Sequence, residues 1–142
     1  AYLQFRPSRL KTYLSMDTDG RVLRFDSLSK ILCPGLRIGF VTGPQPLVER
    51  LNLHTQASSL HSCGVAQAIT LALMEQWKQD SWAGWEQHVS DVCNFYLKQR
   101  DCFLESADRH LQGLAEYNVP EAGMFVWMKL LGVKDSENLI LQ

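Results

Sequence analysis

The chain has 142 residues, of which 46% are hydrophobic and 20% are charged, and its formal net charge is -1. This composition is sufficient for a folded core and is unlike that of a disordered tail. Because the charges are balanced and form no run of one sign, we expect neither nucleic acid nor an anionic membrane as a partner. No apolar stretch reaches the roughly 18 residues that a membrane-spanning helix needs, so a soluble protein is expected.

Cysteine and histidine spacing gives no sign of a metal site. The four cysteines are widely and irregularly spaced, at Cys33, Cys63, Cys93 and Cys102. No CxxC pair is present, so we expect reduced thiols in an intracellular protein rather than zinc ligands or a redox dithiol. The histidines are scattered as well, at His54, His61, His88 and His110. We therefore predict no metal ligands.

The first part of the chain predicts two paired strands. The sequence opens without methionine, and one hypothesis is that it begins inside a larger protein. A turn is predicted at 17–20, where Asp, Thr, Asp and Gly follow one another. Residues 21–26 and 36–42 each have the apolar and β-branched content of a short strand. We expect these two strands to be neighbours in one sheet, joined by the loop that carries Lys30.

Three helices are predicted after the strands. Pro44 and Pro46 suit the first turn of a helix, and residues 56–62 then interrupt its apolar pattern and predict a loop. Apolar residues at three- and four-residue steps predict a second helix over 65–79. The same period continues from Trp82 until Gly113, which can supply a left-handed cap. Such a helix spans about 45 Å and is expected to bridge two bodies of structure.

The last part of the chain predicts two more strands and the start of a helix. Residues 114–119 and 124–130 read as strands that are joined through 120–123. Residues 135–141 resemble a capped helix start that the sequence cuts off. We therefore expect pieces of two domains, neither of them complete.

The richest chemistry lies between the two predicted N-terminal strands. Lys30 follows Ser27 and Ser29 at the end of one strand, and Arg37 precedes the next. A lysine among apolar neighbours loses solvation, which favours the neutral amine that attacks a carbonyl, while hydroxyl and guanidinium groups bind phosphate. Each residue alone has an ordinary explanation: a solvated loop lysine, turn hydroxyls and an ion-paired arginine. Together they indicate a site for a phosphorylated aldehyde.

The combined pattern Ser-x-Ser-Lys-x-x-x-Pro-Gly-x-Arg-x-Gly resembles the lysine motif of fold-type I pyridoxal-phosphate (PLP) aminotransferases of class I/II. The resemblance implies that Lys30 is the catalytic Schiff-base lysine and proton shuttle. It also implies that Ser27, Ser29 and Arg37 bind the phosphate of the cofactor, pyridoxal 5'-phosphate. The seven-residue step from Lys30 to Arg37 resembles the aminoadipate and kynurenine branch of this family.

Further stretches, at 14–22 and 113–125, resemble the same branch, so the likeness covers essentially the whole chain. It implies transfer of an amino group between an amino acid of the 2-aminoadipate or kynurenine class and a 2-oxo acid. It implies a homodimer in the full-length protein as well. A mitochondrial location is expected from the resemblance alone, and a cytoplasmic one otherwise, because the sequence contains no targeting segment.

The fold expected from this resemblance is α/β, as part of the PLP-dependent transferase fold. Residues 1–80 would be the C-terminal part of the large PLP-binding domain, 81–112 a long interdomain helix, and 113–142 the start of the small α+β domain. The family's aspartate at the cofactor ring nitrogen and its companion tyrosine are expected before Ala1. Its arginine for the substrate carboxylate is expected after Gln142.

Two alternatives stay open. A similar lysine motif occurs in the effector domain of PLP-binding transcription regulators, and a truncated chain would be a catalytically silent fragment. The preferred amino acid is not determined by this sequence.

Several other residues receive structural interpretations. Ser58 and Ser59 read as a helix cap rather than a loop that reaches a partner subunit. By spacing, Met124, Phe125 and Trp127 are core residues, although the resemblance places them near the substrate.

Overall fold

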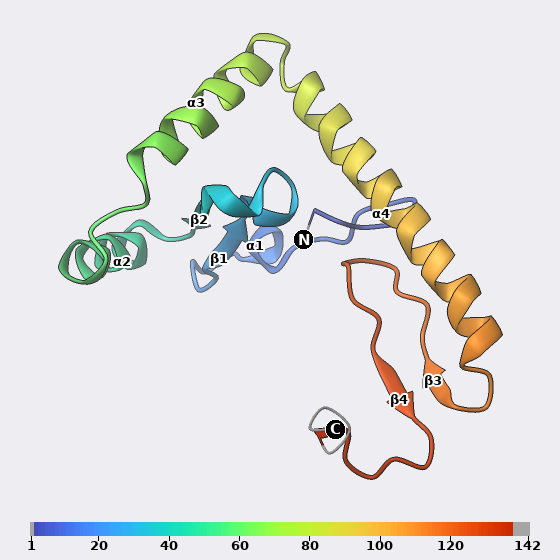
Figure 1. Cartoon of the computed structure of the whole chain (residues 1–142). Helices are drawn as coiled ribbons and strands as arrows, with labels where there is room; N and C mark the ends of the chain where they lie inside the picture. The colour runs from blue at the N-terminus through green and yellow to red at the C-terminus, as the bar shows by residue number, and fades with distance from the viewer. Residues whose placement is uncertain (1, 138–142) are drawn as a thin grey trace. The chain divides into compact units, whose positions relative to one another are not determined.

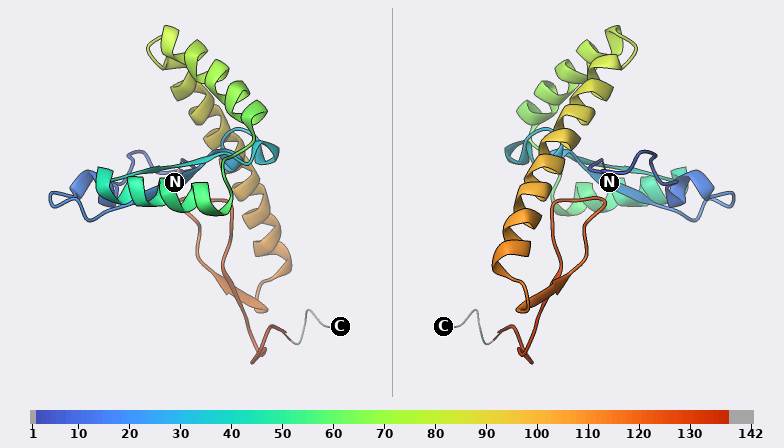
Figure 2. Two further views of the ribbon diagram at one scale, coloured as in Figure 1. Left: turned by 90° about the vertical axis from the view of Figure 1, so that its left-hand side faces the viewer. Right: turned by 90° about the vertical axis from the view of Figure 1, so that its right-hand side faces the viewer.

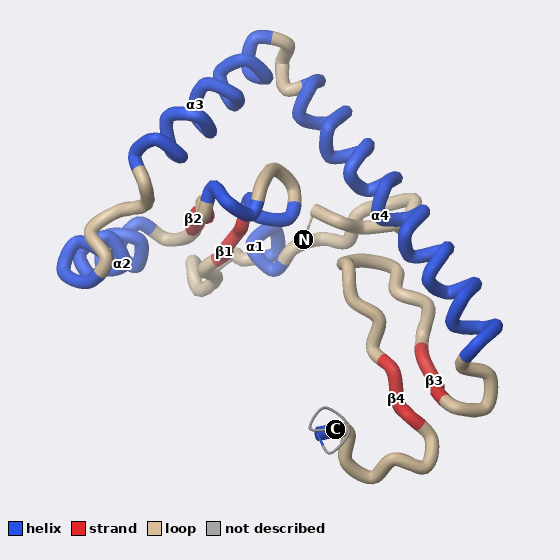
Figure 3. The backbone as a smooth tube through the Cα atoms, in the orientation of Figure 1, coloured by secondary structure: helices blue, strands red, loops and turns tan. Residues whose placement is uncertain are grey.

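The computed structural model describes residues 2–137. The chain forms two compact units, which we describe separately: unit 1 contains Ala1–Pro7 and Ser90–Gln142, and unit 2 contains Ser8–Val89. Figure 1 shows the elements in chain order, and Figure 3 colours the helices and the short strands by type. None of the helices described here is long and apolar enough to cross a membrane.

The two N-terminal strands pair as the sequence predicts. β1 (Arg24–Ser27) and β2 (Gly39–Thr42) are antiparallel, with Arg24 opposite Thr42 and Ser27 opposite Gly39. Both are shorter than predicted. β2 begins only at Gly39 because Arg37 adopts a left-handed conformation (φ 54°), which is incompatible with an extended strand. Residues 28–38, which join the two strands, therefore lie outside the sheet.

The predicted turn at 17–20 precedes β1 and is organised by one carboxylate. It follows the short helix α1 (Tyr13–Met16). Asp17 accepts hydrogen bonds from the N–H groups of Val22 at 2.9 Å and of Arg21 and Asp19, both at 3.2 Å. The N–H groups of Val22 and Arg21 lower the pKa of Asp17, because they stabilise its charged form.

Helices α2 (Gln45–Ser58) and α3 (Gly64–Gln79) follow β2. The predicted loop at 56–62 is wrong in its first half, because α2 continues to Ser58. The hydroxyls of Thr55 and Ser58 donate to carbonyls four residues earlier, each at 2.8 Å, and this accommodates polar side chains inside the helix. Of the two residues predicted as a cap, Ser59 is the C-cap of α2, whereas Ser58 lies within the helix.

The long helix is α4, and its length agrees with the prediction. It runs over Ala83–His110, 28 residues, or about 42 Å at 1.5 Å per residue. Gly113 follows in a turn with φ 76°, the left-handed conformation expected of it. The boundary between the two units falls within α4, after Val89.

Unit 1 contains a hairpin, which Figure 2 shows beside the C-terminal end of α4. Strands β3 (Ala115–Tyr117) and β4 (Met128–Leu130) are antiparallel. β4 is shorter than the predicted 124–130, because residues 125–127 are irregular. Gly123 N–H donates to the carbonyl of Leu3 and Phe5 N–H to that of Glu121, each at 2.9 Å. The start of the chain thus pairs with the segment between β3 and β4.

Each unit has a small buried core. In unit 2, Leu28, Ile31 and Val89 are each 3% exposed. The most buried residues of unit 1 are Ala107 (4%), Leu3 (5%) and Leu104 (9%).

The prediction that Phe125 and Trp127 are core residues is wrong for this chain. They are 81% and 89% exposed, because they lie in the irregular segment before β4 that no described element covers. The helix start predicted at 135–141 lies largely outside the described residues.

Candidate functional site

The segment that carries Lys30 folds into two 3-10 helices, η1 (Leu28–Lys30) and η2 (Pro34–Leu36). Ser27 caps η1, because its hydroxyl oxygen accepts the N–H of Ser29 at 3.2 Å. Leu28 anchors the other side: it is buried, and its N–H donates to the carbonyl of Ile38 at 3.0 Å. The turn is therefore fixed at the exit from β1, where Ser27 and Lys30 are exposed and Ser29 is half-buried.

Arg37 lies at the end of this segment, and its side chain turns back toward the start of it. It is the C-cap of η2 and has a left-handed backbone. Its Nη1 donates to the carbonyl of Pro34 at 3.1 Å and to Oγ of Ser29 at 3.5 Å, the latter eight residues away in sequence. Left-handed non-glycine residues carry strain and are concentrated at functional sites. Ser29 and Arg37, predicted as phosphate ligands, are thus neighbours in space.

Lys30 is exposed, which corrects the expectation that its amine is desolvated. Its apolar neighbours Leu28 and Ile31 are each only 3% exposed, so they occupy the interior and leave the lysine on the solvent side. No carboxylate within residues 2–137 forms an ion pair with Lys30 or Arg37. Two positive charges consequently lie on one segment without compensation.

The nearest acidic residue in sequence, Asp26, is engaged elsewhere. Nη2 of Arg24 donates to its Oδ1 at 3.0 Å, and Nε of the same arginine lies 2.6 Å from Oδ2. The Asp26 side chain is only 7% exposed. The negative charge of β1 is thus neutralised within the strand, and the Lys30 segment keeps the donor set of an anion site: two hydroxyls, a guanidinium and an amine.

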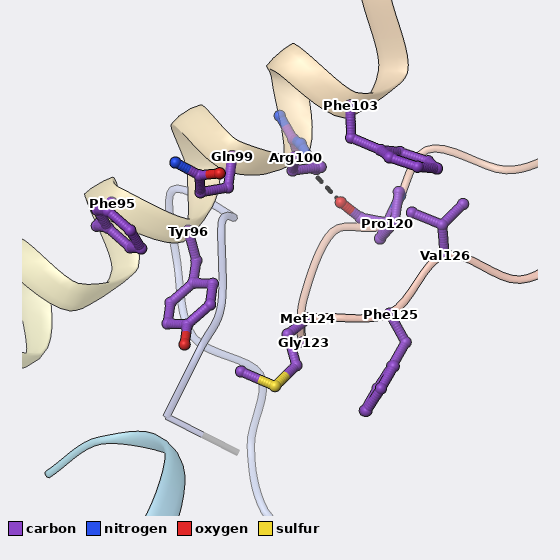
Figure 4. A pocket seen from close by; sticks show the side chains of 10 residues that line it. All are labelled: Phe95, Tyr96, Gln99, Arg100, Phe103, Pro120, Gly123, Met124, Phe125 and Val126. Atoms are coloured by element: carbon purple, nitrogen blue, oxygen red, sulfur yellow. Dashed lines mark hydrogen bonds between the residues drawn. The ribbon is translucent and has the colours of Figure 1, made fainter. Parts of the chain in front are cut away.

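A different part of the chain holds an apolar groove, within unit 1. It has a volume of about 570 Å³ and lies between α4 and the segment before β4 (Figure 4). Arg100 lines it and donates to the carbonyl of Pro120 at 2.9 Å. Met124 and Phe125 line this groove, whereas Ser27, Ser29, Lys30 and Arg37 do not. The groove and the Lys30 segment are separate features.

Two further observations bear on the predicted absence of metal ligands and on the thiols. Within residues 2–137, no cluster of three or more His, Cys, Asp or Glu side chains is arranged to hold a metal ion. All four cysteines are free.

One contact near Lys30 was missed by the sequence interpretation. His88, counted there among the scattered histidines, places Nε2 2.6 Å from the carbonyl oxygen of Ile31. The i, i+3 spacing of Trp85 and His88 on a predicted helix was a signal that the two share a face. Nothing in the sequence indicated that this face meets the Lys30 segment.

Comparison with known proteins gives a consistent family. The family described as Aminotransferase class I and II matches residues 1–139. Kynurenine/alpha-aminoadipate aminotransferase, mitochondrial, of Bos taurus is 50% identical over 139 residues, which are 98% of this chain and 32% of the relative. The same protein of Rattus norvegicus gives the same values. The chain therefore spans about a third of the length of the curated relatives it matches.

Solved structures show the same fold. The alpha-aminoadipate aminotransferase LysN of Thermus thermophilus, complexed with N-(5'-phosphopyridoxyl)-L-leucine, has a TM-score of 0.86 and 26% identity, covering 97% of this chain and 34% of that one. The Pyrococcus horikoshii kynurenine aminotransferase in complex with PMP has a TM-score of 0.83 and 26% identity, covering 99% and 33%. The predicted fold class is thereby confirmed: the chain is part of an α/β PLP-dependent transferase fold.

The residues present fit the cofactor of this family. Pyridoxal phosphate requires donors for a dianionic phosphate and an amine for its aldehyde carbon. Arg37 and Ser29 are already joined by a hydrogen bond, Ser27 lies at the start of the same turn, and the Lys30 amine has no carboxylate partner within residues 2–137. With the family match over residues 1–139 and the 50% identical relatives, the chain belongs to the class I and II aminotransferases, whose cofactor is pyridoxal phosphate.

Proposed function

We propose that this chain is part of a PLP-dependent transaminase, in which Lys30 anchors the cofactor and Ser27, Ser29 and Arg37 bind its phosphate. The observation that carries the proposal is the arrangement of the turn between β1 and β2. There the Arg37 guanidinium meets the Ser29 hydroxyl at 3.5 Å on the segment that exposes the unpaired Lys30 amine.

Phosphate binding follows from the donor set. Arg37 offers a guanidinium whose remaining N–H groups can pair with two phosphate oxygens, and it carries a charge that no described carboxylate neutralises. The Ser27 oxygen already accepts the Ser29 N–H, so its own hydroxyl hydrogen is left to donate. Charge-assisted bonds of this kind are about twice as strong as neutral ones, and they set the position of the whole cofactor relative to Lys30.

Lys30 has two tasks in this proposal. Pyridoxal phosphate, when bound, supplies an aldehyde carbon that condenses with amines and a ring that takes up the electron pair released at the substrate α-carbon. Lys30 Nζ holds the cofactor between turnovers. Once displaced by the incoming amino acid, the Lys30 amine would act as a base that takes the proton from the substrate α-carbon. It would then act as an acid that delivers this proton to the cofactor's former aldehyde carbon. Because Lys30 is exposed, its amine is accessible to the cofactor and to the amino acid substrate.

We propose an amino acid of the 2-aminoadipate or kynurenine class and a 2-oxo acid as substrates. Support comes from the 50% identical relatives, which are named kynurenine/alpha-aminoadipate aminotransferases. The same relatives are named mitochondrial, and this supports a mitochondrial location. The homodimer expected from the resemblance is part of the proposal, as is the division into 1–80, 81–112 and 113–142.

The reported relatives are aminotransferases, and this favours transamination over the alternative of a transcription regulator. The alternative of a catalytically silent fragment concerns the 142 residues by themselves. It predicts that the isolated chain does not transaminate even where a protein of the relatives' length does.

The direct test is a transamination assay on a protein that carries this chain at the length of its relatives. With 2-aminoadipate or kynurenine and 2-oxoglutarate, the wild type is expected to turn over. Lys30→Ala is expected to lose at least about 100-fold in kcat, because both the attachment point and the proton-transferring base are removed. Lys78→Ala, on an exposed turn of α3, is the matched control and is expected to keep full activity. Activity in Lys30→Ala equal to that of the control would refute the proposal.

A further inference from the structure

We infer that His88 is a positioning residue for Lys30, because its imidazole binds the carbonyl that directly follows the lysine turn. This inference rests on the proposed role of Lys30. It adds to that role a residue 57 positions away from the carbonyl it binds, on the first turns of α4, and both partners belong to unit 2.

The contact has a defined direction. His88 Nε2 lies 2.6 Å from the carbonyl oxygen of Ile31. A carbonyl oxygen can only accept, so Nε2 must carry the hydrogen and donate it. The bond is partly buried. A short, partly buried bond between segments so distant in sequence fixes one against the other more firmly than an exposed one.

The Ile31 carbonyl needs this donor. The N–H groups of Ile31 and Leu32 both return to the carbonyl of Leu28, at 3.2 and 2.8 Å, and the helical turn ends there. Carbonyls at the end of a helix lack an intrahelical partner. Ile31 is only 3% exposed, so a carbonyl without a partner would lose its hydration and cost stability. His88 meets this need on the C-terminal side of Lys30, as the Ser27 cap does on the N-terminal side.

The imidazole is itself held in place by two indole rings. The His88 ring centroid lies 5.4 Å from that of Trp77 and 6.4 Å from that of Trp85, with interplanar angles of 32° for both. The two tryptophans contact one another at 5.3 Å. Aromatic contacts at these distances restrict the ring's orientation. The N–H donor of His88 is thus already oriented toward the Ile31 carbonyl.

The junction of α3 and α4 builds this aromatic cluster, which we define as Trp77, Trp85 and His88. The N–H of Trp82 donates to the carbonyl of Trp77 at 2.8 Å across the junction. Gly84 permits the close approach: a Cβ there would lie 2.5 Å from Cδ1 of Trp77. Tight packing at the junction therefore holds the His88 imidazole in the position from which it binds the Ile31 carbonyl.

The test uses a protein of the relatives' length with three substitutions. His88→Phe keeps a ring against the two tryptophans and removes the donor. His88→Gln restores an N–H donor near the position of Nε2. His110→Phe is the matched control, since His110 is an exposed histidine at the last turn of the same helix. Two quantities are measured: amide hydrogen exchange at Ile31 and Leu32 in the cofactor-free protein, and the Kd for pyridoxal phosphate.

For His88→Phe we expect exchange at Ile31 and Leu32 to accelerate by about three- to tenfold and the Kd to rise by a similar factor, as for the loss of one hydrogen bond. His88→Gln is expected to recover both, and His110→Phe to change neither.

Three results would overturn the inference: unchanged exchange at Ile31 and Leu32 in His88→Phe, equal acceleration throughout Ser8–Val89, or no recovery by His88→Gln. A failure of the proposed function is distinguished by Lys30→Ala. If that variant kept the cofactor covalently attached, Lys30 would not be the anchor and the inference would fall with it, whatever the exchange data show.

Discussion

Arg37, the proposed phosphate ligand, combines an unusual backbone with a side chain that turns back onto its own segment. Its φ of 54° is strained for a residue with a Cβ. In this conformation the guanidinium donates hydrogen bonds to Ser29 and Pro34. The sequence predicted the role from residue type and spacing. It contained no indication of the left-handed conformation, because that conformation is common only for glycine and asparagine.

Replacement of Arg37 by lysine tests whether the guanidinium shape matters as well as the charge. A lysine ammonium is a point charge and cannot bind Ser29, Pro34 and two phosphate oxygens at once. In a full-length protein we expect Arg37→Lys to weaken binding of pyridoxal phosphate by about 10- to 100-fold, as for loss of a charged hydrogen bond. Arg50→Lys, on the exposed side of α2, is the control. Equal cofactor affinities in the two variants, measured by titration, would argue against Arg37 as a ligand.

Asp17 predicts a pH dependence. The N–H groups of Val22 and Arg21 lower its pKa below the ordinary value of 3.8 in the folded chain. A carboxylate with a lowered folded-state pKa stabilises the fold fully above its unfolded-state pKa, and this stabilisation is lost as the pH falls through the lower, folded-state value. We therefore expect Asp17→Ala to lower the free energy of unfolding at pH 7, with a difference from wild type that shrinks toward pH 3.

Denaturant titration at both pH values measures this difference. Glu75→Ala, at an exposed position of α3, serves as the control. If the Asp17→Ala difference were as large at pH 3 as at pH 7, the hydrogen bonds of the turn would not be the cause.

At the scale of elements, local chemistry predicted most of what forms. The apolar periods located α3 and α4, and the turn at Asp17 and the left-handed Gly113 were correctly placed. The errors occurred where two signals compete. α2 extends beyond its predicted end because serine and threonine hydroxyls bond to the preceding turn as readily as they favour a loop.

The contact between α4 and the Lys30 segment could not be predicted from one sequence. Hydrogen bonding of His88 to Ile31 depends on how distant segments pack, and a single histidine on a helix face carries no pattern that specifies this. The exposure of Lys30 was missed for a related reason. Leu28 and Ile31 flank Lys30 in sequence, and we expected them to surround its amine. In the structure both are buried, whereas Lys30 is exposed.

The junction of α3 and α4 allows an element-scale prediction. Gly84→Ala places a Cβ 2.5 Å from Trp77 Cδ1 and 2.9 Å from Asp80 Oδ2, so the junction must shift. We expect a loss of about 1–3 kcal/mol in the free energy of unfolding, the usual range for overpacking. Gly64→Ala, at the first position of α3, is the matched control, because its Cβ would meet nothing within 4 Å. It is expected to be neutral or stabilising by up to about 1 kcal/mol.

Urea denaturation monitored by tryptophan fluorescence compares the two variants directly. Equal stability of Gly84→Ala and Gly64→Ala would show that the junction is not tightly packed. A loss in Gly84→Ala that is accompanied by faster exchange at Ile31 would connect the junction to the Lys30 segment as well.

At the scale of the whole chain, much apolar surface is left uncovered in each unit. Phe25 and Val65 of unit 2 are each 69% exposed, and Phe125 and Trp127 of unit 1 are more so. Exposed apolar groups of this number are characteristic of surfaces that contact further protein. Composition predicted a core but not its size, because the hydrophobic fraction does not reveal how much apolar surface the same 142 residues can bury.

The central claim, that Lys30 anchors pyridoxal phosphate, is tested most directly by chemical trapping. A protein that carries this chain at the length of its relatives is incubated with pyridoxal phosphate, reduced with borohydride, digested and analysed by mass spectrometry. We predict a phosphopyridoxyl label on the peptide that contains Lys30, and no label at that site in Lys30→Ala. A label confined to other lysines, or none at all, would contradict the account.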